Sequence, residues 1–441
     1  MIDTDRRKLL GALAAGGIGT AVAGFAQAKQ TLTGRSPVRR DINDMRADDQ
    51  DLLTFKEGVR MMRARSEVNA LDPLGWHIYG SQHSMFCATN SFAMQIHYGW
   101  FFLPWHRAYL SNLEQKIRVL TGRSDFALPY WDWTRSDRLP RAMFGAGNPL
   151  NDTTRIQSPD DVLPADFTEL GPSMSGPTFR HFVGYRRSVD APQIEGTLEQ
   201  SAHNNVHNWI GGNMASFDGA GFDPMFALHH GNIDRLWEGW RAASPTHREP
   251  KEAAWRDYRF AFWGAEKAPV YPRVGDLVDT RALGYGYDRV DWRHTLHAAN
   301  MPSFTGAGQR LGRISAAAAQ RVKVTDGDRK RTAGRAMIQY KRLQLPIHPL
   351  CHRIFLMHGA AAGAPIDQAT YCGTFTLLPI PGAEHGLEES VTTQMVVPPR
   401  ALAALRAGAT AIVSAVPVQL KNRIIPKEPL RFEGVSLTID A

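Results

Sequence analysis

The fold is decided by the stretch DPMFALHHGNIDRLW, which spans Asp223–Trp237. Apolar side chains surround two adjacent histidines there, His229 and His230, and the run predicts a helix from about Pro224 to Trp240. A single histidine on an apolar helix face is most often a hydrogen-bonded core residue. The helix indicates a metal site only if other histidines join it.

Other histidines do lie among aromatic and aliphatic residues. The stretch HNNVHNW at His203–Trp209 belongs to a second predicted helix, Glu199 to Ile210, which the glycines after it would end. His203 and His207 are four residues apart, so their rings share one side of that helix and can reach one ion. Together with His230 they form one group of three.

The second group is His83, His97 and His106. The sequence up to Cys87 has helical spacing, and two apolar stripes follow between Ser91 and Leu120. Pro104 is expected to separate these stripes into two helices. All six histidines are therefore predicted to lie on or beside helices.

A metal would explain the two triads, because it satisfies one nitrogen on each buried ring. Imidazole ligands suit zinc, copper, nickel or iron, so the residues alone leave a zinc hydrolase open. The triads contain no Asp or Glu, which argues against carboxylate-bridged dimetal hydrolases. Three neutral ligands per ion suit a metal that cycles between Cu(I) and Cu(II).

Further motifs identify a family. The strings WHRAYL at 105–110 and FALPYWDW at 126–133 resemble the first copper motif of tyrosinases and plant polyphenol oxidases, and the strings at 203–209 and 223–237 resemble the second. Residues 274–287 look like the segment that closes the plant catalytic domain. The resemblance implies a type-3 copper protein with two copper ions.

The resemblance also implies the ligands. The first copper would take His83, His97 and His106, and the second would take His203, His207 and His230, which leaves His229 a structural role. His77 is the rival of His83, but Cys87 follows His83 by four residues, the plant-like spacing for a cysteine that forms a thioether. A Cys87–His97 thioether crosslink is therefore expected.

Other residues match functional positions of the family. Glu199 and Asn204 match the residues that hold a water acting as the base for phenols, and Phe217 matches the gate over the second copper in plant enzymes. Asn232 and Asp234 are expected to orient an imidazole or a neighbouring arginine. A solvated Glu, a surface amide and a core Phe are the alternatives.

The implied activity is the oxidation of phenols to o-quinones with dioxygen, covering o-diphenols and also ortho-hydroxylation of monophenols. A catechol or o-aminophenol oxidase without monophenolase activity is the alternative, and a haemocyanin-like dioxygen carrier is a third reading. The partners would be small phenols and dioxygen. The formal charge of +8 is spread thinly without basic runs, which argues against nucleic acid.

Along the chain, the sequence predicts a mainly α protein: an antiparallel-type helical bundle that holds the dicopper site, followed by a smaller β-rich domain. The expected bounds are 29–300 for the catalytic domain, 301–335 for a linker and 336–441 for the β-rich domain, a possible shield of the site. The Pro- and Gly-rich segment Thr134–Gln193 is expected to be a surface connection.

The first 28 residues resemble a twin-arginine signal peptide. Arg6-Arg7-Lys8 precedes a weakly apolar run that ends in Ala26-Gln27-Ala28, which predicts export to the periplasm or the medium. An N-terminal membrane anchor is the alternative, and no later segment looks like a stable membrane span. With three cysteines a disulfide framework is excluded, although Cys351 and Cys372 could pair.

Overall fold

The computed structural model describes residues 36–87, 96–185, 194–292, 319–323, 335–346, 348–358, 370–379, 390–403, 410–418, 420–421 and 430–440. The predicted signal peptide and most of the predicted linker lie outside these ranges. Contacts divide the chain into two compact units. Unit 1 comprises Met1–Ile96, Phe101–Asp161 and Gly212–Trp292, and unit 2 comprises His97–Trp100, Val162–Gly211 and Arg293–Ala441. The domain bounds predicted from composition stay predictions.

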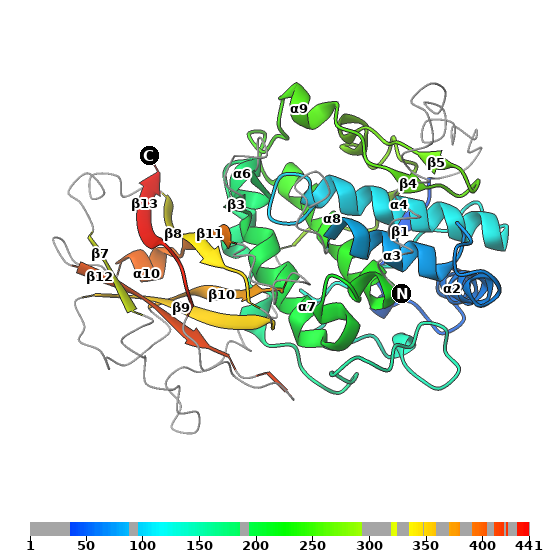
Figure 1. Ribbon diagram of the computed structural model, residues 1–441, viewed down its shortest axis with the longest axis horizontal. Helices are drawn as coiled ribbons and strands as arrows, with labels where there is room; N and C mark the ends of the chain where they lie inside the picture. The colour runs from blue at the N-terminus through cyan, green and yellow to red at the C-terminus, as the bar shows by residue number, and fades with distance from the viewer. Residues whose placement is uncertain are drawn as a thin grey trace. The chain divides into compact units, whose positions relative to one another are not determined.

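Unit 1 is built on four long helices that pack on one another (Figure 1). They are α2 (Gln50–Val68), α3 (Trp76–Cys87), α4 (Phe102–Thr121) and α8 (Met225–Ala243). Shorter elements join them: β1 (Val38–Arg39), η1 (Ile42–Asp44), η2 (Arg141–Met143), η5 (Gly212–Ala215), η6 (Ala220–Phe222), α9 (Ala253–Arg256), β4 (Phe262–Trp263), β5 (Pro269–Val270), η7 (Val274–Leu277) and β6 (Gly286–Tyr287). The helix predicted from Pro224 is confirmed as α8.

The prediction that Pro104 separates two helices is wrong. Pro104 is the third residue of α4, where the missing N–H has no partner to lose, so the helix continues to Thr121 and ends at Gly122 in the left-handed conformation. Residues 96–101 are not helical, and Tyr98 has a φ of 62°. His97 therefore lies in a turn before α4 rather than on a helix.

The segment after residue 134 is also not the predicted surface connection. It has little regular structure, as expected, but many of its apolar side chains are fully buried. These include Leu139, Met143, Leu150, Phe167 and Phe182. An irregular backbone can bury side chains without any periodicity, so the absence of a pattern did not indicate exposure.

Unit 2 contains two β-sheets and the second histidine helix. One sheet has the order β10-β9-β12-β7 and the other β13-β8-β11-β3-β2. The strands are β2 (Gly184–Tyr185), β3 (Ile194–Glu195), β7 (Ala319–Lys323), β8 (Arg335–Gln344), β9 (Leu350–His358), β10 (Tyr371–Leu377), β11 (Ser390–Val397), β12 (Thr410–Pro417) and β13 (Gly434–Asp440). All pairs are antiparallel except β11 with β3. The predicted β-rich C-terminal region is confirmed.

Short helices complete unit 2. They are η3 (Ala165–Phe167), α5 (Gly171–Met174), α6 (Phe179–Phe182), the π-helical turn η4 (Glu199–His203), α7 (Asn204–Ile210) and α10 (Pro399–Ala403). The turn η4 runs directly into α7, so the predicted helix Glu199–Ile210 exists as these two parts. Because β3 pairs with β11, the chain just before this helix belongs to the C-terminal sheet.

Cys351 and Cys372 are not joined by a disulfide, although β9 and β10 are neighbours. Cys351 lies opposite Thr376, while Cys372 lies at the bulge between Tyr371 and Gly373. Four residues of strand separate the two positions by more than about 10 Å, since each residue advances about 3.3 Å. A disulfide needs Cα atoms closer than about 7 Å.

Lys116 on α4 is completely buried, and its ammonium group has no hydrogen-bond partner among the described residues. Burial lowers the pKa of Lys116 to about 7. Between pH 7 and about 10.5 the unfolded chain therefore binds a proton at this residue that the folded chain does not, so this residue makes stability rise with pH in that window.

The variant Lys116→Met should consequently be more stable than the wild type at pH 7. Its advantage should shrink by up to about 1.4 kcal/mol per pH unit as the pH rises toward 10. Urea unfolding of both proteins at pH 7, 8.5 and 10 measures the difference. An advantage that stays constant with pH would mean that Lys116 is not protonated differently in the two states.

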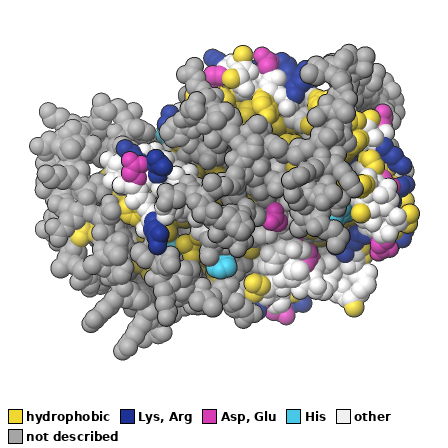
Figure 2. All heavy atoms as spheres, viewed as in Figure 1, with side chains coloured by type: hydrophobic (Ala, Val, Ile, Leu, Met, Phe, Trp, Pro, Cys, Tyr) yellow, Lys and Arg dark blue, Asp and Glu magenta, His cyan; other side chains and the backbone are white. Residues whose placement is uncertain are grey.

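On the face shown in Figure 2, the described basic and acidic side chains are interspersed, and neither kind forms one large patch. This agrees with a thinly spread net charge. Among the described residues, no helix is both long enough and apolar enough to cross a membrane.

Candidate metal centre

Unit 1 brings three of the six predicted ligand histidines together. His83 lies on α3, His106 on α4 and His230 on α8, and all three are buried. The ring centroids of His83 and His106 are 5.8 Å apart, and those of His106 and His230 are 4.2 Å apart. Helices that are distant in sequence thus place three imidazoles side by side.

Backbone carbonyls orient two of these rings. The Nδ1 atom of His83 lies 3.0 Å from the carbonyl oxygen of Phe217, and that of His106 lies 2.7 Å from the carbonyl oxygen of Phe102. A carbonyl oxygen only accepts, so each ring donates through Nδ1 and keeps a lone pair on Nε2. This is the tautomer that a metal ion needs, and such hydrogen bonds typically fix metal-bound histidines.

The neighbouring His229 has the opposite tautomer. The indole N–H of Trp133 donates to its Nδ1 over 3.2 Å, and an indole can only donate. The proton of a neutral His229 therefore lies on Nε2, which leaves that atom without a lone pair for a metal. His230 instead stacks on Phe226 with ring centroids 4.0 Å apart. The tautomers support His230 as the ligand of the doublet.

Unit 2 brings the other three predicted ligands together. The ring centroids of His97 and His203 are 5.6 Å apart, and those of His203 and His207 are 4.5 Å apart. His203 ends η4 and His207 lies one turn later on α7, as their spacing predicts. All three rings are buried.

Side-chain oxygens orient two of these rings. The Nδ1 atom of His97 lies 2.7 Å from Oε1 of Glu199, and that of His203 lies 2.8 Å from Oδ1 of Asn204. Both contacts leave Nε2 for a metal in the same way as in unit 1. Glu199 also accepts from the backbone N–H of Tyr98, so the carboxylate fixes both the His97 ring and its turn.

Glu199 and Asn204 thus contact predicted ligands directly, and a further glutamate joins them. The amide nitrogen of Asn204 donates to Oε1 of Glu195 over 2.9 Å and to the carbonyl oxygen of Thr376 over 3.0 Å. Burial raises the pKa of Glu195 to about 8, and burial and Glu195 raise the pKa of Glu199 well above its usual value. Glu195 was not predicted, because its strand β3 is two residues long.

The remaining predicted residues lie near the unit 1 histidines. Cys87 is buried at the end of α3, and its sulfur and one ring nitrogen each of His83 and His106 lie within 4.8 Å of one another. The Phe217 side chain is buried, and its carbonyl holds His83, a predicted ligand of the first copper. His77, the rival ligand, packs on Phe222 and is only partly buried. The gate role of Phe217 stays a prediction.

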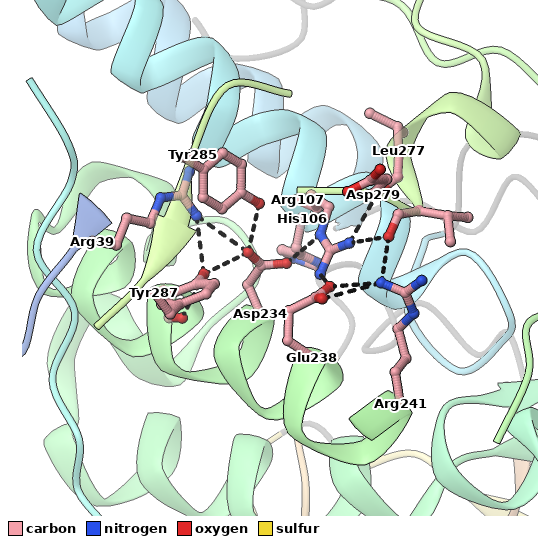
Figure 3. Close-up of polar contacts among 12 residues, drawn as sticks. Arg39, His106, Arg107, Asp234, Glu238, Arg241, Leu277, Asp279, Tyr285 and Tyr287 are labelled. Carbon is pink, nitrogen blue, oxygen red and sulfur yellow. Dashed lines mark hydrogen bonds and ion pairs between the residues drawn. The ribbon is translucent and has the colours of Figure 1, made fainter. Parts of the chain in front are cut away.

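Asp234 is the centre of a buried ionic network (Figure 3). Its Oδ1 accepts from Nε of Arg107 over 2.5 Å, and its Oδ2 accepts from Arg39 and from the hydroxyls of Tyr285 and Tyr287. Burial alone would raise the pKa of Asp234, but the two guanidinium groups lower it below its usual value. The network joins α8 to α4, on which Arg107 follows His106, and to strands β1 and β6.

Further ion pairs extend this network on both sides. Arg107 also pairs with Glu238 on α8 over 2.7 Å, and Arg39 pairs with Glu114 on α4 over 2.6 Å. The predicted residue Asn232 accepts from Nε of Arg235, which fits one of its two expected roles, the orientation of an arginine. Helices α4 and α8 are thereby fixed beside His106 and His230.

The donor set fits copper. Four of the six rings donate through Nδ1 to an oxygen, which leaves imidazole Nε2 atoms as neutral ligands. Neutral imidazoles without carboxylate ligands suit copper better than the oxygen-preferring metals magnesium, calcium and manganese.

Comparison with known proteins shows which family this chain resembles. Residues 73–183 and 178–243 match the common central domain of tyrosinase, and residues 249–296 match the polyphenol oxidase middle domain. Polyphenol oxidase B of Solanum lycopersicum is 28% identical over 283 residues, 54% of this chain and 48% of that protein. Tyrosinase HcTyr1 of Hahella sp. is 31% identical over 296 residues, 54% of this chain and 61% of that protein.

Solved structures share the fold. Latent apple tyrosinase matches with a TM-score of 0.73 at 20% identity and covers 92% of this chain and 98% of its own. A functional unit of octopus hemocyanin matches with a TM-score of 0.56 at 16% identity, covering 91% and 99%.

The fold and its histidine clusters define a type-3 copper protein, whose cofactor is a pair of copper ions. Within that class, the chain is similar to tyrosinases and polyphenol oxidases over the matched residues 73–243 and 249–296. The chain spans about half the length of the first curated relatives it matches.

Proposed function

We propose that this protein oxidises phenols to o-quinones with dioxygen at a coupled dicopper centre. The observation that carries the proposal is the Nδ1 anchoring of His83, His106, His97 and His203, which presents Nε2 lone pairs from buried rings. Relatives named polyphenol oxidase, catechol oxidase and tyrosinase support the same activity. The substrates are small phenols.

The proposed ligands follow the family motifs. His83, His97 and His106 would hold the first copper, and His203, His207 and His230 would hold the second. The copper pair would supply the electron transfer from catechols to dioxygen. The protein's own groups orient the rings through Phe217, Phe102, Glu199 and Asn204.

We also propose a thioether between Cys87 and His97 and export of the folded chain by the twin-arginine route. The thioether is supported by the spacing of Cys87 from His83 and by the burial of both Cys87 and His97. The export proposal rests on Arg6-Arg7 and the short apolar run that follows.

One observation favours a second candidate, a catechol or o-aminophenol oxidase without monophenolase activity. Both N–H groups of Asn204 are engaged by Glu195 and Thr376, and its oxygen accepts from His203. An amide with these three partners orients His203 and keeps only the second lone pair of its oxygen for a water. Glu195 and Glu199 then remain as the buried carboxyls beside the site.

Steady-state turnover of tyrosine, simple monophenols and matching catechols by copper-loaded protein separates the two candidates. If Glu199 and Asn204 handle the phenol proton, Glu199→Gln and Asn204→Asp should slow monophenols by roughly 100-fold or more and catechols much less. Equal losses on both substrates would mean that these residues only orient His97 and His203. Asn148→Asp, which changes an amide in unit 1 held by Ala142 and Phe144, is the matched control.

A further inference from the structure

One edge of strand β10 lies beside the two stretches of unit 2 that carry histidines, residues 97–98 and 203–207. These two stretches are called the histidine segment below. In the sheet order β10 is the outermost strand, so one side of its backbone has no neighbouring strand in that sheet. Carbonyl groups of alternate residues on an extended strand point to the same side. Those of Thr374 and Thr376, and that of Leu378 directly after the strand, would otherwise lack strand partners.

Side chains beside three predicted copper ligands donate hydrogen bonds to these carbonyl oxygens. The amide nitrogen of Asn205 donates to Thr374 over 3.0 Å, and that of Asn204 donates to Thr376 over 3.0 Å. The hydroxyl of Tyr98 donates to the carbonyl of Leu378 over 3.0 Å. Tyr98 follows His97, Asn204 follows His203, and Asn205 lies midway between His203 and His207.

All of these groups are buried, which makes the contacts costly to break. Tyr98, Asn204 and Asn205 have no exposed surface. A buried polar group that loses its partner costs about 1–3 kcal/mol. The segment can therefore not move away from β10 without leaving carbonyl groups and donors unsatisfied.

The strand itself is fixed independently of the histidines. Buried Asp166 accepts from the hydroxyl of Thr374 over 2.7 Å and from Nε of Arg353 on β9 over 2.8 Å. Asn205 also donates to the carbonyl of Phe167, which ends η3 beside Asp166. These contacts hold the edge of β10 in place without the histidines, so the strand can support the histidine segment.

We propose that the edge of β10 positions His97, His203 and His207 for copper, with Asn205 and Tyr98 as positioning residues. The C-terminal sheet that contains β10 is then part of the scaffold of the metal centre in this chain. This inference rests on the proposed function, because it takes these three histidines as ligands.

The decisive variants are Asn205→Asp and Tyr98→Phe. Aspartate has the shape of asparagine but cannot donate to Thr374 and Phe167, and phenylalanine removes only the hydroxyl that reaches Leu378. Asn148→Asp is the control, since the partly buried Asn148 also donates to two backbone carbonyls, those of Ala142 and Phe144, which lie outside β10.

Full-length variants are titrated with Cu(I) under nitrogen in competition with a chelator, and thermal midpoints are measured with and without Cu(I). Asn205→Asp should bind Cu(I) about 10–100-fold more weakly, as loss of groups that orient ligands does. Tyr98→Phe should weaken binding in the same direction, and Asn148→Asp should not. The rise in midpoint on adding Cu(I) should shrink in the first two variants.

Wild-type Cu(I) affinity in both variants would overturn the inference. A lower thermal midpoint with an unchanged rise on adding Cu(I) would also overturn it, because this result indicates a purely structural role. If Asn205→Asp does not fold, Tyr98→Phe decides alone, because it removes a single oxygen atom. A wild-type chain that binds no Cu(I) would instead contradict the proposed function.

Discussion

Replacement of His230 by glutamine should lower the copper content from two ions per chain to one, whereas the same replacement of His229 should leave two. The two residues are adjacent on α8 but their rings have different surroundings. Trp133 donates to Nδ1 of His229, and a glutamine oxygen at this position can accept the same bond. His230 stacks on His106 and Phe226, and a glutamine amide is a poorer copper ligand than an imidazole.

Catechol oxidation should follow the copper content. The variant His230→Gln should lose more catechol oxidation than the roughly 10–100-fold that removal of an orienting neighbour costs, because the proposed ligand itself is removed. His229→Gln should stay within about tenfold of the wild type. Elemental analysis after dialysis and dioxygen uptake with a catechol measure both effects. Loss of copper from His229→Gln alone would reverse the assignment of the doublet.

The helices that carry the proposed ligands were predictable where periodicity and spacing agree. His203 and His207 share a helix face because they are four residues apart, and the run at 223–237 forms α8. His97 was misplaced because its turn is held by a distant group, the carboxylate of Glu199, which local pattern cannot reveal. A hydrogen bond between residues about 100 positions apart leaves no pattern in the sequence around either of them.

The residues that hold the histidine rings and their helices in place were less predictable than the histidines themselves. Asp234 was expected to orient a neighbour, but its partners Arg39, Tyr285 and Tyr287 come from both ends of unit 1. Glu195 was missed, and so was the edge of β10. A backbone carbonyl has no residue type, so a support made of carbonyls, such as that of Thr374 for Asn205, is invisible to sequence motifs.

Asp234→Asn should destabilise the folded protein by about 3–5 kcal/mol, the usual cost of removing one partner from a buried ion pair. Asp234 is 3% exposed and accepts four donors, two of them guanidinium groups that stack on aromatic rings. Asparagine keeps the shape but removes the charge that compensates Arg107 and Arg39. Glu238 and Glu114 remain, so we expect weakened rather than absent folding.

The sign of the pH dependence follows from the lowered pKa of Asp234. Its contribution is fully present above the usual carboxyl pKa of about 4 and is lost as the pH falls through the lower folded value. The gap in unfolding free energy between wild type and Asp234→Asn should therefore be constant from pH 5 to 7 and narrow below pH 4.

Urea unfolding of the two proteins at pH 3, 4, 5 and 7 measures this gap. Asp276→Asn is the control, because Asp276 pairs with Arg273 but is 61% exposed, so its loss should cost only about 0–1 kcal/mol. A gap for Asp234→Asn no larger than that of the control would mean that the network in Figure 3 does not hold α4 against α8. Since His106 and His230 lie on these two helices, the same loss should also weaken copper binding.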